Sequence, residues 1–229
     1  LLFKLIWKLI RLVLLIVILG ITYFYLTVPI YDFPDRTTFT GKNLFNPYEG
    51  VDSTNWLRSN FQIQSHAWLG ITGGSKNTNE AIDSIYTMLG YDINAISDYM
   101  KISDYGMDRE NYIRVYEHGY GWKKWHQVCI GSERVTWRDY PIFQTINHKQ
   151  HMINVLRKQN ELVYIAHPQL RFGWKPEDLQ YLTGYDGVEV LNYMRFSIEH
   201  WDAALSSGRY VTILGNDDAH DIGIDRSIQ

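Results

Sequence analysis

An apolar run that ends in acidic and imidazole side chains places the strongest constraint on the fold. Residues 209–220 read Arg-Tyr-Val-Thr-Ile-Leu-Gly-Asn-Asp-Asp-Ala-His, and the run 210–214 predicts a buried strand. Asp217, Asp218 and His220 follow it, so they are expected at the C-terminal end of the strand, where α/β proteins gather their functional groups. Three other strand-like runs also end in histidine, at His66, His118 and His167. Together, these strand ends predict a shared metal site.

The composition limits the kinds of domain and site that the chain can form. With 229 residues, 45% of them hydrophobic, it can bury a substantial core and is expected to form one domain with appendages. The net charge of −3, without a basic face, predicts that nucleic acid is not a partner. Cys129 is the only cysteine, so no intrachain disulfide can form, and a metal would need nitrogen and oxygen ligands.

An uncharged apolar run near the N-terminus predicts a transmembrane helix. Residues 12–28 carry no charge, and the apolar residues before them lengthen the run while Lys4, Lys8 and Arg11 extend to the interface. A cleavable signal peptide is the alternative, but no small-x-small cleavage site follows. Because the basic residues precede the run, the positive-inside rule predicts a cytoplasmic N-terminus and an extracytoplasmic domain, which is periplasmic in a Gram-negative cell. Residues 1–30 are therefore predicted to be a single-pass membrane anchor.

The rest of the chain divides into a linker, residues 31–54, and a domain, residues 55–229. The linker is rich in turn residues and has no sustained period. In the domain, strand-like runs are expected at 61–65, 93–97, 112–117, 127–130, 162–166, 187–191 and 210–214, and helices at 81–89, 142–159 and 196–206. Asn77 and Glu80 have the spacing of a capping box before the first of these helices. Because the later strands alternate with helices, a parallel sheet or barrel is favoured over a sandwich.

Several motifs, taken in order, resemble those of the PHP (polymerase and histidinol phosphatase) superfamily. They are Gln62-Ile-Gln-Ser-His66 for the family's Asp-x-His-x-His, Ala95-Ile-Ser-Asp-Tyr99 for Ile-Thr-Asp-His, Tyr116-Glu117 for Gly-x-Glu, His126 followed by Val-Cys-Ile-Gly131, Ile165-Ala-His-Pro168, Gly187-Val-Glu-Val190, and Asn216-Asp-Asp-Ala-His220 for Gly-Ser-Asp-Ala-His. The resemblance covers roughly residue 60 to the end. It implies an α/β fold, a distorted (β/α)7 TIM-like barrel with a cluster of up to three metal ions at the C-terminal ends of its strands.

The resemblance also implies a set of metal ligands, which are His66, Glu117, His126, His167, Asp218 and His220. Gln64 and Tyr99 depart from the family, because each stands where the family has a histidine. An amide oxygen or a phenol is a weaker ligand than imidazole, so one or two divalent ions, zinc or manganese, are expected rather than three. Gln64 and Tyr99 are then expected to lie next to the ligands. The set of one glutamate and two histidines is of the kind that holds catalytic zinc.

The resemblance implies metal-dependent hydrolysis, with a phosphoester, either a phosphorylated small molecule or envelope material, as the first expected substrate. A bound ion lowers the pKa of water towards ~7 and polarises a phosphoryl oxygen. Asp218 and His220 are expected to be catalytic, with His220 as a general acid. Arg195 and Arg171 are expected to contact an anionic group of the substrate. Glu189 is expected to point to the other face of its strand.

The sequence is also consistent with two other functions. The two departures from the family are also consistent with a relative that lacks catalysis and serves as a binding module or as a subunit docked to a membrane-protein partner. A hydrolase of envelope glycans is the second alternative, because tryptophans can stack on sugar rings. The candidates for such stacking are Trp68, Trp122, Trp125, Trp137 and Trp174.

Overall fold

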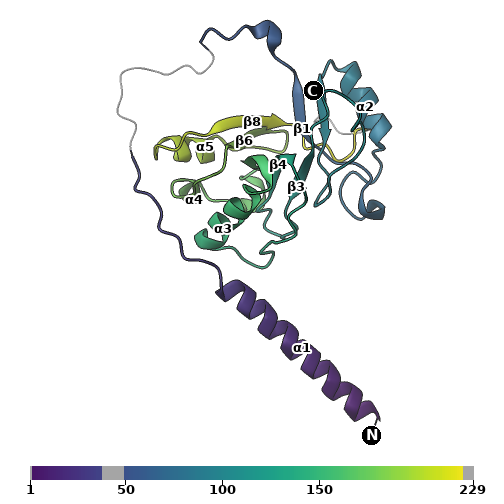
Figure 1. The fold of residues 1–229 in the computed structure, drawn as a ribbon, viewed down its shortest axis with the longest axis vertical. Coiled ribbons are helices and arrows are strands. Elements are labelled where there is room, and N and C mark those ends of the chain that lie inside the picture. The colour runs from purple at the N-terminus through teal and green to yellow at the C-terminus, as the bar shows by residue number, and fades with distance from the viewer. Residues whose placement is uncertain (1, 38–48, 224–229) are drawn as a thin grey trace. The chain divides into compact units, whose positions relative to one another are not determined.

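The computed structural model describes residues 2–37 and 49–223, and the chain divides into two units. The first unit, Leu1–Asp32, is built on helix α1 (Leu2–Leu26) (Figure 1). At ~1.5 Å per residue this helix is roughly 37 Å long, which exceeds the ~30 Å hydrocarbon core of a bilayer. Within the described ranges it is the one helix long and apolar enough to cross a membrane. The chain thus has an N-terminal apolar helix, as membrane anchors and signal sequences do. Much of the predicted linker, residues 38–48, lies outside the described residues.

The second unit contains eight strands and four α-helices among its described residues. Each of the seven predicted strand runs overlaps a strand, and β7 is additional. The strands are β1 (Ser59–Ile63), β2 (Ile93–Ile96), β3 (Val115–His118), β4 (Gln127–Ser132), β5 (Asn160–Ile165), β6 (Gly187–Asn192), β7 (Arg195–Phe196) and β8 (Thr212–Asn216). The helices are α2 (Asn79–Met88), α3 (Ile146–Leu156), α4 (Pro176–Leu179) and α5 (Ile198–Leu205).

The strands form two open sheets, so the predicted distorted (β/α)7 TIM-like barrel is wrong. β1 and β2 pair in parallel as one sheet, and the other six strands form a mixed sheet in the order β3-β4-β5-β6-β7, with β8 paired to β6 (Figure 1). The pairs β3–β4 and β4–β5 are antiparallel, whereas β5–β6 and β6–β8 are parallel. A parallel pair needs a crossover of about a dozen residues or more, and only residues 119–126 separate β3 from β4. This short connection makes an antiparallel hairpin in place of a strand-helix-strand unit.

Two single bridges link the edges of the sheets near the predicted site. Ile63, at the end of β1, pairs with Ala219, which follows β8. Tyr99, which follows β2, pairs with Glu117 of β3. The C-terminal ends of β1, β2 and β8 therefore lie beside β3, although they come from distant parts of the sequence.

The start of α2 differs from the predicted capping box. Thr78 is the N-cap, and its hydroxyl accepts a hydrogen bond from the Ala81 backbone N–H at 3.2 Å. Asn77 instead donates from its side-chain amide to the backbone carbonyl of Gln64 at 2.8 Å. Asn77 thus holds the chain that follows β1.

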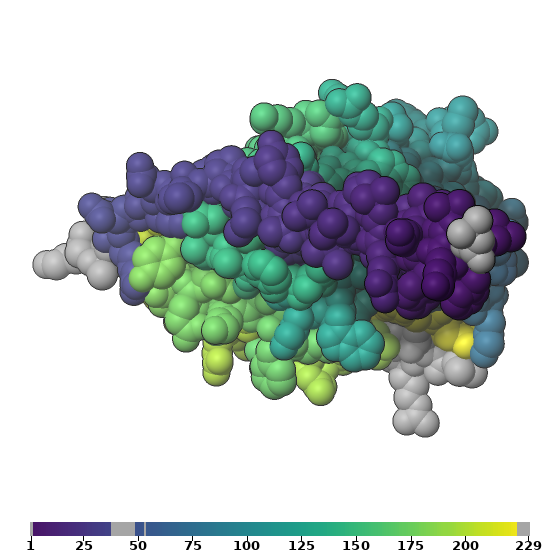
Figure 2. Space-filling view, turned by 90° about the horizontal axis from the view of Figure 1, so that it is seen from below, coloured from purple at the N-terminus to yellow at the C-terminus, as the bar shows by residue number. Residues whose placement is uncertain are grey.

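An apolar core fills the space between the large sheet and its helices. Its main cluster includes Ile165 of β5 and Val188 of β6. Trp125 and Trp174, which were candidates for sugar stacking, are 8% and 1% exposed and belong to this cluster, so they are core residues. The space-filling view shows the green and yellow-green segments of this unit packed directly against one another (Figure 2).

Gly173 lies where two loops approach too closely for a side chain. A Cβ atom here would lie 2.3 Å from the carbonyl oxygen of Lys123 and 2.6 Å from that of Lys124. Because both obstacles are backbone atoms, Gly173→Ala is expected to lower the free energy of unfolding by about 1–3 kcal/mol in denaturant melts. Gly215→Ala is the control, since the nearest atom to its Cβ is a side-chain carbon of Leu191 at 3.4 Å. Equal losses in the two variants would argue against the close approach.

Candidate metal centre

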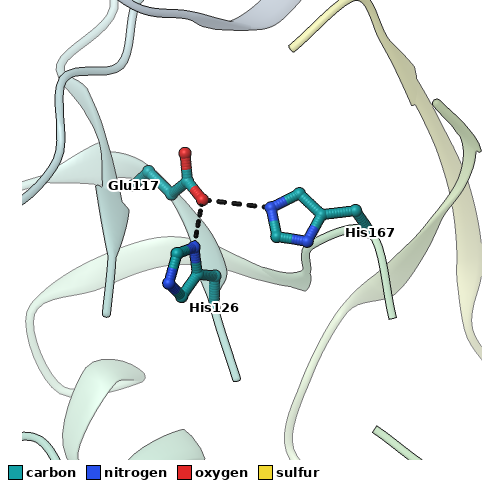
Figure 3. Close-up of side chains that lie close together, drawn as sticks. All are labelled: Glu117, His126 and His167. Carbon is teal, nitrogen blue, oxygen red and sulfur yellow. Dashed lines mark hydrogen bonds and ion pairs between the residues drawn. The ribbon is translucent and has the colours of Figure 1, made fainter. Parts of the chain in front are cut away.

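Three buried side chains converge from strand β3 and from the segments that adjoin β4 and β5. They are Glu117 of β3, His126 just before β4 and His167 just after β5, and each is at most 2% exposed. Glu117 Oε1 is paired with His126 Nδ1 and lies 3.1 Å from His167 Nε2 (Figure 3). One ligand atom from each residue lies within 4.8 Å of the other two, and in the described part of the chain no other group of His, Cys, Asp or Glu meets this test. This triad could hold a metal ion.

The donor set fits a divalent transition metal. One carboxylate and two imidazoles are ligands that zinc prefers, and they leave a coordination position for a further group. A fully buried carboxylate also needs a positive charge near it. In the described chain, the ion pairs of Glu117 are those with His126 and His167, and none involves Lys or Arg. The positive charge therefore comes from an imidazolium or from a metal ion.

The backbone fixes the triad by two devices. Glu117 lies on β3 and His126 directly precedes β4. The two strands pair as a hairpin up to His118, the last residue of β3, which lies opposite Gln127. His167 has a φ of 27°, in the left-handed region that is strained for a residue with a Cβ atom. Its backbone N–H donates to Glu189 Oε2 at 2.6 Å. This buried hydrogen bond holds the strained turn that directs His167 towards the triad.

Gln64 and Tyr99, which were expected next to the ligands, both contact the triad. Gln64 Nε2 donates to Glu117 Oε2 at 2.7 Å and to the carbonyl of Ser97 at 3.0 Å. The ring of Tyr99 packs edge-on against His126, with 5.4 Å between the centroids. Gln64 therefore places an N–H donor on the second carboxylate oxygen of Glu117.

The electrostatics of the triad favour one proton shared by the three groups. Burial opposes the charged form of Glu117, but the charges and hydrogen bonds of His126 and His167 outweigh it and hold its pKa well below the usual range. Burial, only partly offset by Glu117, lowers the pKa of His126 to about 4. Burial acts in the same direction on His167, but its hydrogen bond with Glu117 and the charges of Asp218 and Glu117 raise its pKa to about 9. Near neutral pH the metal-free triad thus holds one carboxylate and one imidazolium.

The pH dependence of metal binding follows from this charge state. Below about pH 9, a metal ion must displace the proton of His167, so binding should release about one proton. The logarithm of the association constant should rise by about one unit per pH unit up to about pH 9 and then level off. Calorimetric zinc titrations from pH 6.5 to 9.5 measure this slope. A pH-independent constant would contradict the assigned protonation state.

Asp218 and His220, the predicted catalytic pair, lie beside the triad. Asp218 is 1% exposed, has a φ of 50°, and accepts a hydrogen bond from Asn192 Nδ2 at 3.4 Å. Burial and the charge of Glu117 raise the pKa of Asp218 to about 6. Nδ1 of His220 lies 3.7 Å from Asp218 Oδ1, and its Nε2 lies 3.4 Å from the Tyr99 hydroxyl. Both residues are close to the triad without forming part of it.

Glu189 belongs to the site, although it was expected on the other face of its strand. It is fully buried, and its carboxylate accepts hydrogen bonds from the backbone N–H of His167 and from Asn216 Nδ2, the latter at 3.1 Å. Burial, partly opposed by the charge of His167, raises its pKa to about 8. The sequence does contain a signal for this role, because Glu189 is an acidic residue inside an otherwise apolar strand run. Burying a carboxylate costs free energy unless it is paired, so such a residue is expected to have a partner.

Three other predicted site residues are exposed and are not members of the triad. His66 is exposed, and its Nδ1 contacts the backbone carbonyl of Ser75. Arg195 is exposed in the short strand β7. Arg171 is exposed and has its guanidinium carbon 4.7 Å from the centre of the Trp122 ring.

Comparison of the chain with protein-family models and with curated proteins gives no match. The resemblance to the PHP superfamily therefore stays a prediction that rests on the motifs quoted above. The structure itself shows the buried triad and the groups around it.

Proposed function

We propose that the chain is a membrane-anchored, metal-dependent hydrolase that acts on phosphoesters. The observation that supports this most directly is the buried triad of Glu117, His126 and His167, one member of which also lines a cavity of about 220 Å³. The choice of phosphoesters rests on the motif resemblance to the PHP superfamily. One zinc or manganese ion is proposed, because Gln64 occupies the second carboxylate oxygen of Glu117.

In this proposal the triad holds the ion and the neighbouring residues handle protons. When bound, the ion supplies activated water near neutral pH and polarises a phosphoryl oxygen. Asp218 is buried next to the triad and orients the attacking water through its carboxylate. The His220 side chain is 32% exposed, so its Nε2 can reach a substrate and protonate the leaving oxygen as a general acid.

The location of the enzyme in this proposal follows from α1. The helix is long enough to span a bilayer, and Lys4, Lys8 and Arg11 lie in its N-terminal half. Cytoplasmic loops are rich in such residues, so the N-terminus is placed in the cytoplasm and the second unit outside it. Protease protection of intact spheroplasts, with an epitope tag at each end, tests this orientation.

Turnover of p-nitrophenyl phosphate by the full chain in detergent tests the activity. His167→Ala should lose its metal and at least ~100-fold in kcat/KM, because it removes a ligand of the ion that stabilises the transition state. His151→Ala is the matched control, because this side chain contacts Arg138 instead of the triad. Wild-type activity in metal-free His167→Ala would contradict the proposal.

A second function, that of a binding module without catalysis, is favoured by one observation. Gln64 stands where the PHP pattern has a histidine ligand. Its side chain donates a hydrogen bond to Glu117 and so has a structural role. If the wild-type chain keeps its ion and turns over no phosphoester, this function is the better account.

A third function, hydrolysis of envelope glycans, is favoured by aromatic side chains on the surface. Trp68, Trp122 and Trp137 are 43%, 77% and 61% exposed, and the rings of Trp68 and Trp137 lie edge-to-face at 6.0 Å. Parallel assays on phosphorylated and unphosphorylated glycans separate this function from the first. Equal turnover of both would favour it.

A further inference from the structure

A cavity next to the triad has the polar groups of an anion site. It measures about 220 Å³, and its lining includes Thr72, Tyr99, Lys124 and His126. The hydroxyl of Thr72 is buried without a hydrogen-bond partner. Buried polar atoms are normally paired, so this hydroxyl is available to a ligand or to water.

Lys124 supplies the positive charge of this cavity. Its Nζ lies 3.4 Å from the Tyr99 hydroxyl and 5.0 Å from the centre of the Tyr99 ring. Within the described ranges it forms no ion pair with a carboxylate. A half-buried ammonium whose protein neighbour is a phenol has unused capacity to hold an anion.

The backbone holds Lys124 in place. Its φ is 59°, in the strained left-handed region, where non-glycine residues cluster at ligand sites. Gly173 of the neighbouring loop approaches the carbonyl groups of Lys123 and Lys124 so closely that no Cβ would fit. The backbone around Gly173 thus packs directly against the loop that carries Lys124.

The charges around Tyr99 indicate when an anion can enter. The Tyr99 hydroxyl lines the cavity beside Lys124 and can donate a hydrogen bond to an anion, while the carboxylates of Glu117 and Asp218 lie on the side of the triad. The same carboxylates would repel an anion while the triad is empty of metal. A divalent ion in the triad would make the local charge more positive and so favour an anion.

We propose that this cavity is an anion subsite, in which Lys124 and the Tyr99 hydroxyl hold the phosphate of the substrate next to a metal-loaded triad. The inference rests on the proposed function and adds the residues that select an anionic substrate. Since the metal favours the anion, the anion must favour the metal by the same factor. Tyr120, which also lines the cavity and is 54% exposed, is placed to contact the organic part of the phosphoester.

Calorimetric titration of inorganic phosphate into the full chain in detergent tests the subsite. Zinc-loaded wild-type protein should bind phosphate more tightly than the chelated protein. Lys124→Met should weaken binding to the zinc-loaded protein by ~10–100-fold, because it removes a charged hydrogen-bond donor. Methionine, like lysine, is unbranched at Cβ, so the strain energy of the left-handed backbone should be about the same in the variant as in the wild type. Lys124→Arg should stay within about tenfold of wild type.

Two further variants keep the test decisive. Lys123→Met changes the adjacent exposed lysine and should leave binding within about twofold. Tyr99→Phe should weaken binding by ~3–10-fold, because it removes a neutral hydrogen bond. Zinc content and circular dichroism are measured on each variant. If Lys124→Met proves unfolded, the Tyr99→Phe result decides.

Three results would overturn the subsite: no phosphate binding by the zinc-loaded wild type, equal binding by Lys124→Met, or an equal loss in Lys123→Met. Turnover of p-nitrophenyl phosphate with an unchanged KM in Lys124→Met would reject the subsite and leave the hydrolase proposal standing. Phosphate binding that depends on Lys124, with no turnover by the wild type, would support the subsite and reject hydrolysis.

Discussion

Glu117→Gln should lose more than ~100-fold in metal affinity, so that zinc is removed by dialysis. The substitution keeps the shape of the side chain but removes the one anionic ligand of the triad. Changes to groups that merely contact ligands already cost about 10–100-fold in affinity, and a direct ligand should cost more. Elemental analysis and competition with a zinc-binding dye measure the loss.

The metal-free form of Glu117→Gln gives an independent readout. Without the carboxylate, the pKa of His167 should fall from about 9, because burial then acts with less opposition. Nuclear magnetic resonance titration of the imidazole resonances measures this shift. Glu110→Gln, which changes an exposed glutamate, is the control for the loss of a carboxylate. Full zinc content in Glu117→Gln would show that the triad does not hold the ion.

Gln64→His is expected to raise the metal content from about one ion per chain to about two. Gln64 now donates an N–H to Glu117 Oε2, whereas a neutral imidazole can offer a lone pair to a cation at the same place. Asp218 Oδ1 is buried without a hydrogen-bond partner and acts on Glu117 through its charge, so it is available as a further ligand. Elemental analysis after dialysis against sub-stoichiometric chelator gives the count.

A surface histidine must not produce the same result. Gln159→His adds an imidazole next to Arg134, and its metal content should stay at about one ion. A count of one ion in Gln64→His would mean that the amide does not limit the number of metals. The departure at Gln64 would then say nothing about how this chain differs from the PHP pattern.

The strands were predictable from the sequence, but their arrangement was not. Runs such as 162–166 and 187–191 are apolar and β-branched, and each overlaps a strand. Such runs do not reveal whether neighbours pair in parallel, and the short connection from β3 to β4 makes an antiparallel hairpin. The barrel, which the resemblance to the PHP superfamily implied, is wrong at this point, because the strands pair in an open mixed sheet.

The positions of the triad residues were easier to predict from the sequence than those of the residues around them. Glu117, His126 and His167 each lie at or near a strand end, and that position is visible in the sequence. The positive φ angles of His167 and Lys124 could not be predicted from the sequence, because non-glycine residues rarely adopt such angles. The sequence therefore gives no sign that Lys124, in the connection between β3 and β4, lies at the site.

Elemental analysis of the purified full chain tests the central claim most directly. The buried triad predicts about one zinc or manganese ion per folded chain, retained through dialysis and released by a strong chelator. A fully folded chain that contains no metal and takes up none on titration with either ion would contradict it.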